Sequence, residues 1–375
     1  MAKHLNISIG TVSRALNGRA DVSEETRKRV LEAAKRLGYS PNQSGRSLRR
    51  GSTGMVGFMV IANRSRAVRG EAFFMTVFDG VQSVLAKENL DLVIYYCGDG
   101  QSPETYVQRI VERGLVDGLI VSQTTRVDHR IDYLIQQNLP FIAFGRSQSG
   151  GDHSWIDLDF EGVAEQSIDL LTRLGHRRIA VATPAGDVNY GFVYTEACRA
   201  ALKRRGLELD DDLVIREAIS EAGGYRVGER LLAMKQRPTG VVAVENSLAI
   251  GLYSKLKDAG VAPGRDISVV GFDETPTFGL FLQPPLTRFR LELVDLGRWL
   301  GTHMVELIEA KRAGKTIPFA QKVWPLELVV GASTMPVSPA ADGAPEVVSA
   351  EAGAKRRVSR TARTSSLLAG STARD

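Results

Sequence analysis

The apolar residues near the N-terminus are spaced as in a helix. Val12, Ala15 and Leu16 recur at positions i, i+3 and i+4, which places the three side chains on one face. Ser8 is a favoured N-cap residue, and Gly18 suits the left-handed exit from a helix. The pattern therefore predicts a helix between Ser8 and Gly18 whose apolar face packs inward.

Another helix is predicted after Ser23, an N-cap residue followed by two glutamates that the helix dipole favours in the first turn. Gly38 is the expected end of this helix. Asn6 separates the helix after Ser8 from the stub of an earlier one. This order predicts a helix-turn-helix motif over residues 1–39, with the helix after Ser8 as the recognition helix. The inward stripe of the later helix is Val30, Ala33, Ala34 and Leu37.

From residue 54 onward, short apolar runs alternate with amphipathic stretches, as buried parallel strands and their crossover helices require. The predicted strands are 55–61, 92–96, 118–121, 141–144, 179–182, 241–244 and 267–272. Helices predicted between them include 78–88, 128–137, 162–174, 197–205 and 247–259. Residues 54–335 thus predict two doubly wound parallel sheets facing a cleft. Residues 336–375 have no periodicity and no leucine heptads, and we expect them to be disordered.

The net charge of +5 is concentrated at the N-terminus. Residues 1–51 carry 11 Lys and Arg against 4 Asp and Glu, and residues 336–375 carry 6 against 4, so the middle of the chain is acidic. A basic patch alone can be a solvated surface. A basic patch that coincides with a helix-turn-helix pattern indicates binding to the phosphate backbone of DNA.

Several classes of protein lack support in the sequence. No run approaches the 18 apolar residues of a membrane helix, and no secretory signal follows Met1. Cys97 and Cys198 give neither a zinc spacing nor a disulfide framework, so we expect a cytoplasmic protein without a metal or cofactor. An enzyme is disfavoured because no glycine-rich phosphate loop or nucleophile elbow occurs. The histidines are scattered: His4, His129, His153, His176 and His303.

The runs 8–18, 22–27, 37–42 and 46–49 occur in order and resemble the N-terminal signature of the lac repressor (LacI/GalR) family. Further similarity extends to about residue 331. The resemblance implies a helix-turn-helix headpiece, a hinge helix over residues 40–53 and a core like that of periplasmic binding proteins. The family has several more residues in its first helix than this chain has before Asn6. We therefore expect that either the start of the protein lies upstream of Met1 or DNA binding is impaired.

A set of positions is expected to contact DNA. Arg14 is the best candidate for a base contact, because arginine can bond bidentately to guanine, and Ile9, Gly10 and Ser13 would lie near bases. The resemblance makes Leu48 a wedge in the minor groove. Thr11, Asn17, Ser23 and Arg46 are expected to contact phosphate or to set the register on the duplex, and Ser8 is also expected at the DNA-binding surface.

Ligands of open α/β sheets bind outside the carboxyl ends of the strands, where this chain carries polar residues such as Ser122 and Asn246. The resemblance implies effector contacts at Phe73, Phe74, Ser122, Arg146, Asn189, Tyr190, Tyr194, Ile219, Asn246 and Asp273. A carboxylate such as Asp273 can bind vicinal hydroxyls, and aromatic faces can stack on a sugar ring. Alternatively, strand-end Asp and Asn residues only cap the next helix, and the phenylalanines belong to the core.

Two departures from the family bear on the effector. Relatives often carry an arginine where Tyr194 stands, and Asp-Asn where this chain has Asp157 and Leu158. The loop 63–71 is longer than usual and carries three arginines, which either reach an anionic ligand or form a solvated surface.

We expect a transcriptional regulator, with repression as its action. It binds a pseudo-palindromic operator as a homodimer, and a small-molecule effector, a sugar or sugar derivative, controls it from the interlobe cleft. The alternative is a cytoplasmic small-molecule-binding protein whose headpiece is non-functional. A secreted solute-binding receptor would share the core, but neither the basic headpiece nor the absence of a signal peptide fits it.

Overall fold

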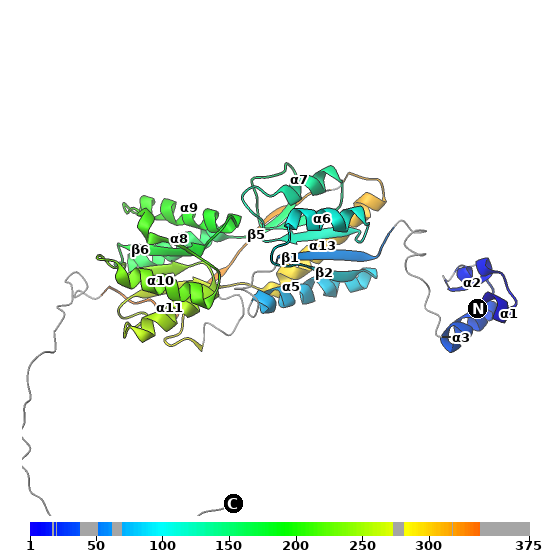
Figure 1. Ribbon diagram of the computed structural model, residues 1–375, viewed down its shortest axis with the longest axis horizontal. Coiled ribbons are helices and arrows are strands. Elements are labelled where there is room, and N and C mark those ends of the chain that lie inside the picture. Colours follow the sequence, from blue (N-terminus) through cyan, green and yellow to red (C-terminus); the bar gives the residue numbers. More distant parts are fainter. Residues whose placement is uncertain are drawn as a thin grey trace, which may run out of the picture. The chain divides into compact units, whose positions relative to one another are not determined.

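The structure, a computed structural model, describes most of the headpiece and nearly all of the core (Figure 1). The described residues are 1–16, 19, 21–37, 52–61, 70–272, 281–316 and 318–337, without the side chains of 70–72. Outside them lie residues 40–51 of the predicted hinge, residues 63–69 of the loop with three arginines, the predicted C-terminal tail from residue 338, and four predicted site residues: Asn17, Arg46, Leu48 and Asp273.

The headpiece consists of α1 (Ala2–Leu5), α2 (Ile9–Leu16) and α3 (Glu24–Arg36). Asn6 has the left-handed backbone (φ 53°, ψ 46°) that turns the chain between α1 and α2. The Oγ atom of Ser8 accepts a hydrogen bond from the backbone N–H of Thr11 at 3.0 Å, so the predicted cap of α2 is confirmed. The three helices thus follow the order that the sequence predicts.

A small cluster of Val12, Ala15, Val22 and Val30 forms the apolar centre of the headpiece. Met1, Ala2 and Leu5 pack against it although α1 has only four residues. The short first helix thus gives α2 a partial scaffold, although α1 itself contributes no fully buried residue.

The predicted inward stripe of α3 is confirmed at Val30, Ala33 and Ala34, which are buried. It is wrong at Leu37, whose side chain is 52% exposed. Leu37 is the C-cap residue, so it lies beyond the last helical turn, where the helical spacing no longer directs a side chain inward.

The cap of α3 gives a testable prediction. Ser23 Oγ accepts the backbone N–H of Thr26 at 3.3 Å and donates to the Oγ1 atom of Thr26 at 2.9 Å. Ser23→Ala is expected to lower the stability of α3 by about 1 kcal/mol. Hydrogen exchange of the first α3 amides should become roughly fivefold faster, because they lose an acceptor. Ser23→Asp keeps an acceptor and should retain the protection; equal exchange in both variants would contradict the cap.

The core contains two six-stranded sheets, each with helices on both faces (Figure 1). Sheet 1 has the order β11-β5-β4-β3-β1-β2 with parallel neighbours throughout. Its strands are β1 (Met55–Ile61), β2 (Asp91–Cys97), β3 (Gly118–Ser122), β4 (Phe141–Phe144), β5 (Ser154–Leu158) and β11 (Gln321–Trp324). The helices of this lobe, lobe 1, are α5 (Gly70–Leu85), α6 (Pro103–Glu112), α7 (His129–Gln136) and α13 (Leu293–Arg312).

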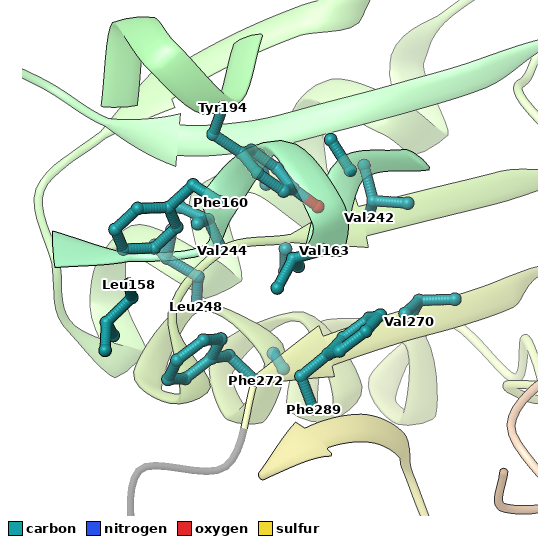
Figure 2. Packing of buried hydrophobic residues seen from close by; sticks show 14 of the residues in the cluster. Leu158, Phe160, Val163, Tyr194, Val242, Val244, Leu248, Val270, Phe272 and Phe289 are labelled. Carbon is teal, nitrogen blue, oxygen red and sulfur yellow. The ribbon is translucent and has the colours of Figure 1, made fainter. Parts of the chain in front are cut away.

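Sheet 2 has the order β12-β10-β9-β8-β6-β7, and only β12 runs antiparallel to its neighbour. Its strands are β6 (Ile179–Pro184), β7 (Val214–Glu217), β8 (Gly240–Ala243), β9 (Ser268–Phe272), β10 (Thr287–Arg290) and β12 (Glu327–Val329). The helices of lobe 2 are α8 (Phe160–Arg173), α9 (Asn189–Arg204), α10 (Glu221–Ala233) and α11 (Asn246–Asp258). Figure 2 shows the packed centre of this lobe, with Val242 and Val270 from neighbouring strands.

The chain passes between the lobes three times: from β5 to α8, from β10 to α13, and from β11 to β12. The predicted fold class is confirmed, and each of the seven predicted strands is present within one or two residues. The strands that the pattern did not predict are β5, β7, β10, β11 and β12. β7, β11 and β12 are edge strands, which need no continuous apolar run because a neighbouring strand covers only one side, and β5 and β10 each lie next to an edge.

Candidate functional site

One face of α2 is exposed and carries residues suited to DNA bases. Ile9 is 80% exposed, and the side chain of Arg14 is 52% exposed and lies 3.7 Å from the carboxylate of Asp21. Ser8 and Gly10 are also exposed, whereas Thr11 and Ser13 are half-buried. The buried Val12 and Ala15 face the other way. The structure thus places the described DNA-contact candidates of α2 around one solvent-facing surface.

The glycine in this face leaves open space. A Cβ atom built on Gly10 would approach nothing closer than the Ser8 Oγ at 3.5 Å, so packing within the headpiece does not require a glycine there. Exposed Ile9 likewise has no role in the headpiece core, and an isoleucine on such a face can contact a thymine methyl group. Both residues are explained more simply by a partner that approaches α2 closely.

A pocket lies between the two lobes and is lined by side chains of both. Lobe 1 and its crossover contribute Phe73, Phe74, Ser122, Gln123, Thr124, Phe144, Gly145, Arg146, Asp157 and Leu158. Lobe 2 contributes Phe160, Tyr190, Val244, Glu245 and Phe272. Most of these residues stand at the carboxyl ends of strands or in the first turn of the following helix, so the parallel topology itself brings them together.

Aromatic rings cover both sides of the pocket. In lobe 1, Phe73 packs edge-on against Phe74 at 5.3 Å and stacks on Phe144 at 6.1 Å between ring centroids. In lobe 2, Phe160 stacks between Tyr190 at 5.0 Å and Phe272 at 6.4 Å. These rings offer flat apolar surfaces of the kind that pack against the C–H face of a sugar ring or against a base.

Arg146 joins charged groups of both lobes at the pocket. Its Nε donates to the Oδ2 of Asp157 at 2.8 Å, and its Nη1 and Nη2 donate to the two carboxylate oxygens of Glu161 at 2.9 and 2.7 Å. Burial raises the pKa of Asp157, and the contact with Arg146 opposes that rise. Glu161 pairs through a bidentate geometry, and the hydrogen bonds from Arg146 hold the pKa of its carboxyl below the ordinary value against the effect of burial.

A second polar group lies in lobe 2. Glu245 is buried at the end of β8 and accepts a hydrogen bond from the phenol of Tyr190, which lies in the first turn of α9. This contact places a carboxylate and an aromatic ring side by side in the pocket wall. Carboxylate oxygens accept hydrogen bonds from ligand hydroxyl groups, so the pair suits a polyhydroxylated ring.

The structure brings some of the predicted effector residues to the pocket wall and places others behind it. Phe73, Phe74, Ser122, Arg146 and Tyr190 line the pocket. Asn189 supports the wall from behind, because its Nδ2 donates to the carbonyl oxygen of Arg146 at 2.8 Å. Tyr194, Ile219 and Asn246 are buried and are not among the described lining residues.

Tyr194 belongs to the core of lobe 2, in one hydrophobic cluster with Phe160 and Val163 (Figure 2). It is 1% exposed, and burial raises the pKa of its phenol well above the ordinary value. Relatives often have an arginine at position 194. In this chain the buried Tyr194 therefore offers no polar contact to a ligand in the pocket.

The sequence prediction did not include several lining residues. From the sequence, Asp157 and Leu158 stand out only as departures from the family, and Gln123 only as a polar residue at a strand end. Glu245 does not stand out, although it lines the pocket. Glu245 directly follows the predicted strand 241–244, so the rule of polar residues at strand ends could have found it. The aromatic Phe144, Phe160 and Phe272 gave no such signal, because a phenylalanine at a strand end reads as core.

Two backbone hydrogen bonds join the lobes at the rim of the pocket. The backbone N–H of Asn189 donates to the Thr124 carbonyl at 2.9 Å, and that of Arg126 donates to the Asp187 carbonyl at 3.1 Å. Thr125 and Val188 form an antiparallel bridge between them. The Arg126 guanidinium also lies 4.6 Å above the ring of Phe192 in α9. The rim is therefore closed by contacts that exist only when the lobes are together.

In the part of the chain that the structure describes, no three His, Cys, Asp or Glu side chains lie where they could hold a metal ion. Among the helices that the structure describes, none is long and apolar enough to cross a membrane.

Comparisons with known proteins give consistent matches. Residues 1–42 match the model of bacterial regulatory proteins of the lacI family, and residues 168–334 match a periplasmic binding protein-like domain. The HTH-type transcriptional regulator AglR of Rhizobium meliloti is 30% identical over 356 residues, which cover 92% of this chain and 97% of AglR.

Solved structures show the same architecture. A complex of the transcriptional regulator CelR with cellobiose is 27% identical with a TM-score of 0.67, and the match covers 88% of this chain and 98% of CelR. The lac repressor dimer bound to operator and an anti-inducer has a TM-score of 0.75 at 21% identity, with 89% and 97% of the two chains covered. These matches support the fold that the sequence predicts.

Proposed function

Since the chain belongs to the lacI family of bacterial regulatory proteins, it is a DNA-binding transcriptional regulator, and we propose that a sugar or sugar derivative in the interlobe pocket controls its affinity for DNA. In this proposal it acts in the cytoplasm as a homodimer. Each subunit places α2 in the major groove of one half of a pseudo-palindromic operator, and repression is the expected outcome.

The observation that carries the proposal is the pocket lined from both lobes. A ligand that contacts both Arg146 of lobe 1 and Glu245 of lobe 2 binds the closed arrangement better than an open one. By linkage, such a ligand shifts the population toward the closed state. A regulator whose DNA affinity differs between the two states then responds to that ligand.

The DNA-contact roles are part of the proposal. Arg14 is assigned to a guanine and Ile9 to an apolar base contact, because both are exposed on the same face of α2. Ser8, Gly10, Thr11, Ser13 and Ser23 complete this surface or lie beside phosphates, and Asn17, Arg46 and Leu48 retain the roles expected from the sequence. Asp273 likewise stays a proposed effector contact.

We propose that the pocket binds its ligand without transforming it. The known relatives are transcriptional regulators, and a binding function explains each polar group of the described wall as a hydrogen-bond partner for hydroxyls.

A direct test measures binding to a palindrome from the protein's own promoter region and to random DNA, at one salt concentration, with and without a panel of sugars. Fixed salt matters because the affinity of proteins for DNA falls steeply with ionic strength. The proposal expects preference for the palindrome and a change in that affinity with at least one sugar. Equal binding to both DNAs would support the alternative, a small-molecule-binding protein whose headpiece is non-functional.

The rim contact gives a prediction about closure. Arg126→Ala removes the cation that lies over Phe192 from the opposite lobe, which should weaken the closed state and lower effector affinity about two- to fivefold. Arg216→Ala is the matched control, since Arg216 lies 4.2 Å over the same ring but comes from lobe 2 itself. Equal losses of effector affinity in the two variants would mean that Phe192 stabilises only its own lobe.

A further inference from the structure

We propose that the effector is an uncharged carbohydrate, and that the pocket rejects phosphorylated or carboxylated sugars because protein carboxylates already neutralise its arginine. The inference rests on the proposed function, since it assigns the charge of a ligand for the same pocket.

The described wall of the pocket contains one cationic side chain, Arg146, and no lysine or histidine. It contains two carboxylates, Asp157 and Glu245. Glu161 adds a third, because it is bound to Arg146 although it does not itself line the pocket. One cation among three carboxylates gives the described polar cluster a negative balance.

The geometry shows that Arg146 is committed to these carboxylates. Its Nε, Nη1 and Nη2 atoms each donate to a carboxylate oxygen at 2.7–2.9 Å. Asp157 is buried, with its side chain 5% exposed, so the pair with Arg146 stabilises a charge that water does not reach. An anionic ligand could use the guanidinium as a clamp only by displacing Glu161 or by approaching Asp157 closely. Both processes are unfavourable.

The arrangement joins the two lobes. Arg146 and Asp157 belong to lobe 1, whereas Glu161 lies in the first turn of α8 and belongs to lobe 2. Lobe 2 therefore already supplies an anion to the arginine, which a phosphate or carboxylate of a ligand would have to replace. Guanidinium N–H groups that do not face a carboxylate can still donate to neutral hydroxyl groups.

The rest of the wall suits an uncharged ring. Aromatic faces from both lobes can pack on the C–H surfaces of a sugar, and the carboxylates of Asp157 and Glu245 can accept hydrogen bonds from its hydroxyls.

The experiment uses the full chain and sugars that share one ring but differ in charge. The probes are D-glucose, D-glucuronate, D-glucose 6-phosphate and D-glucosamine, with the galactose series and cellobiose in parallel. Binding is measured by calorimetry, and the effect on operator affinity by a DNA-binding assay. We expect a neutral sugar to bind at least about tenfold more tightly than its acid or phosphate, since like charges this close repel strongly.

A variant distinguishes the effect of the Arg146–Glu161 pair on ligand preference from the effect of the protein's overall charge. Glu161→Gln removes the carboxylate that lobe 2 brings to Arg146 and should reduce the preference for the neutral sugar severalfold. Glu165→Gln is the matched control, because Glu165 lies one turn further along α8 and pairs with Arg204 and Arg205. It removes the same charge and should leave the preference unchanged.

Each outcome decides a separate point. Tighter binding of an acid or phosphate than of its neutral parent would overturn the uncharged class while leaving the sugar-responsive regulator intact. Tighter binding of glucosamine would also overturn it, in favour of a cationic ligand. If no sugar of any charge binds or changes operator affinity, the sugar-responsive part of the proposed function fails, and this inference fails with it.

Discussion

Arg14→Ala is expected to lower operator affinity by roughly tenfold to a hundredfold for each subunit, because a bidentate contact between arginine and guanine contributes about 1–3 kcal/mol of discrimination. The side chain is half exposed, and among the described residues its ion pair is the 3.7 Å contact with Asp21, so its loss should not disturb the headpiece. Affinity for random DNA should fall much less. The measurement is the ratio of the two affinities at one salt concentration.

The core offers a matched control for this variant. Arg298 forms an ion pair with Asp295, and the two side chains are 56% and 57% exposed, close to the 52% and 58% of Arg14 and Asp21. Arg298→Ala therefore removes the same charge from a similar environment outside α2. It should leave the ratio of operator to random-DNA affinity unchanged. An unchanged ratio in Arg14→Ala as well would remove Arg14 from the set of base contacts.

Much of the fold could be predicted because burial on both faces of a sheet demands apolar runs. β1 and β4 have the bounds that the pattern predicts, and both are buried along most of their length. β11 escaped prediction because its sequence alternates exposed and half-buried residues at the edge of sheet 1. An edge strand is defined by its neighbour, and a neighbour distant in sequence leaves no local signal.

The starts of two helices at the pocket were also not predicted from the sequence. The predicted helices 78–88 and 197–205 correspond to α5 and α9, which begin eight residues earlier, at Gly70 and Asn189. The early turns carry Phe73, Phe74 and Tyr190, which line the pocket, and Phe74 also continues the buried stripe of Val77 and Val81. Phe73 and Tyr190 are only partly buried, so they add no clear apolar period from which the start of a helix could be predicted.

The site itself was predicted by residue type and by resemblance, but its electrostatics were not. The sequence singles out Arg146 as a ligand contact at a strand end. The structure adds that Asp157 and Glu161 already bind its guanidinium, and no spacing in the sequence relates these residues. The charge that a pocket presents to a ligand depends on such ion pairs. It can therefore be determined from the three-dimensional structure but not from the sequence.

Arg146→Ala tests this pair through stability. The variant leaves Asp157 buried without its cation, and the loss of one partner of a buried pair destabilises a protein by about 3 kcal/mol. Thermal unfolding of the core should shift downward by several degrees. The control is Arg178→Ala: Arg178 is 28% exposed against 23% for Arg146, but its partners Asp210 and Asp212 are 51% and 62% exposed. Surface pairs of that kind contribute at most about 1 kcal/mol.

The loss in Arg146→Ala should depend on pH. Burial already raises the pKa of Asp157 in the native protein, and removing Arg146 removes the contact that opposes the rise. The folded variant then holds a proton on Asp157 at pH values where the unfolded chain has lost it, so stability falls as pH rises through this window. The variant loses the full stability of the Arg146–Asp157 pair above the raised pKa of Asp157, and this loss disappears below the ordinary pKa of an aspartate. Unfolding at pH 8 should therefore show a larger deficit than unfolding at pH 5. A deficit independent of pH would show that the variant loses packing and not the partner of a buried charge.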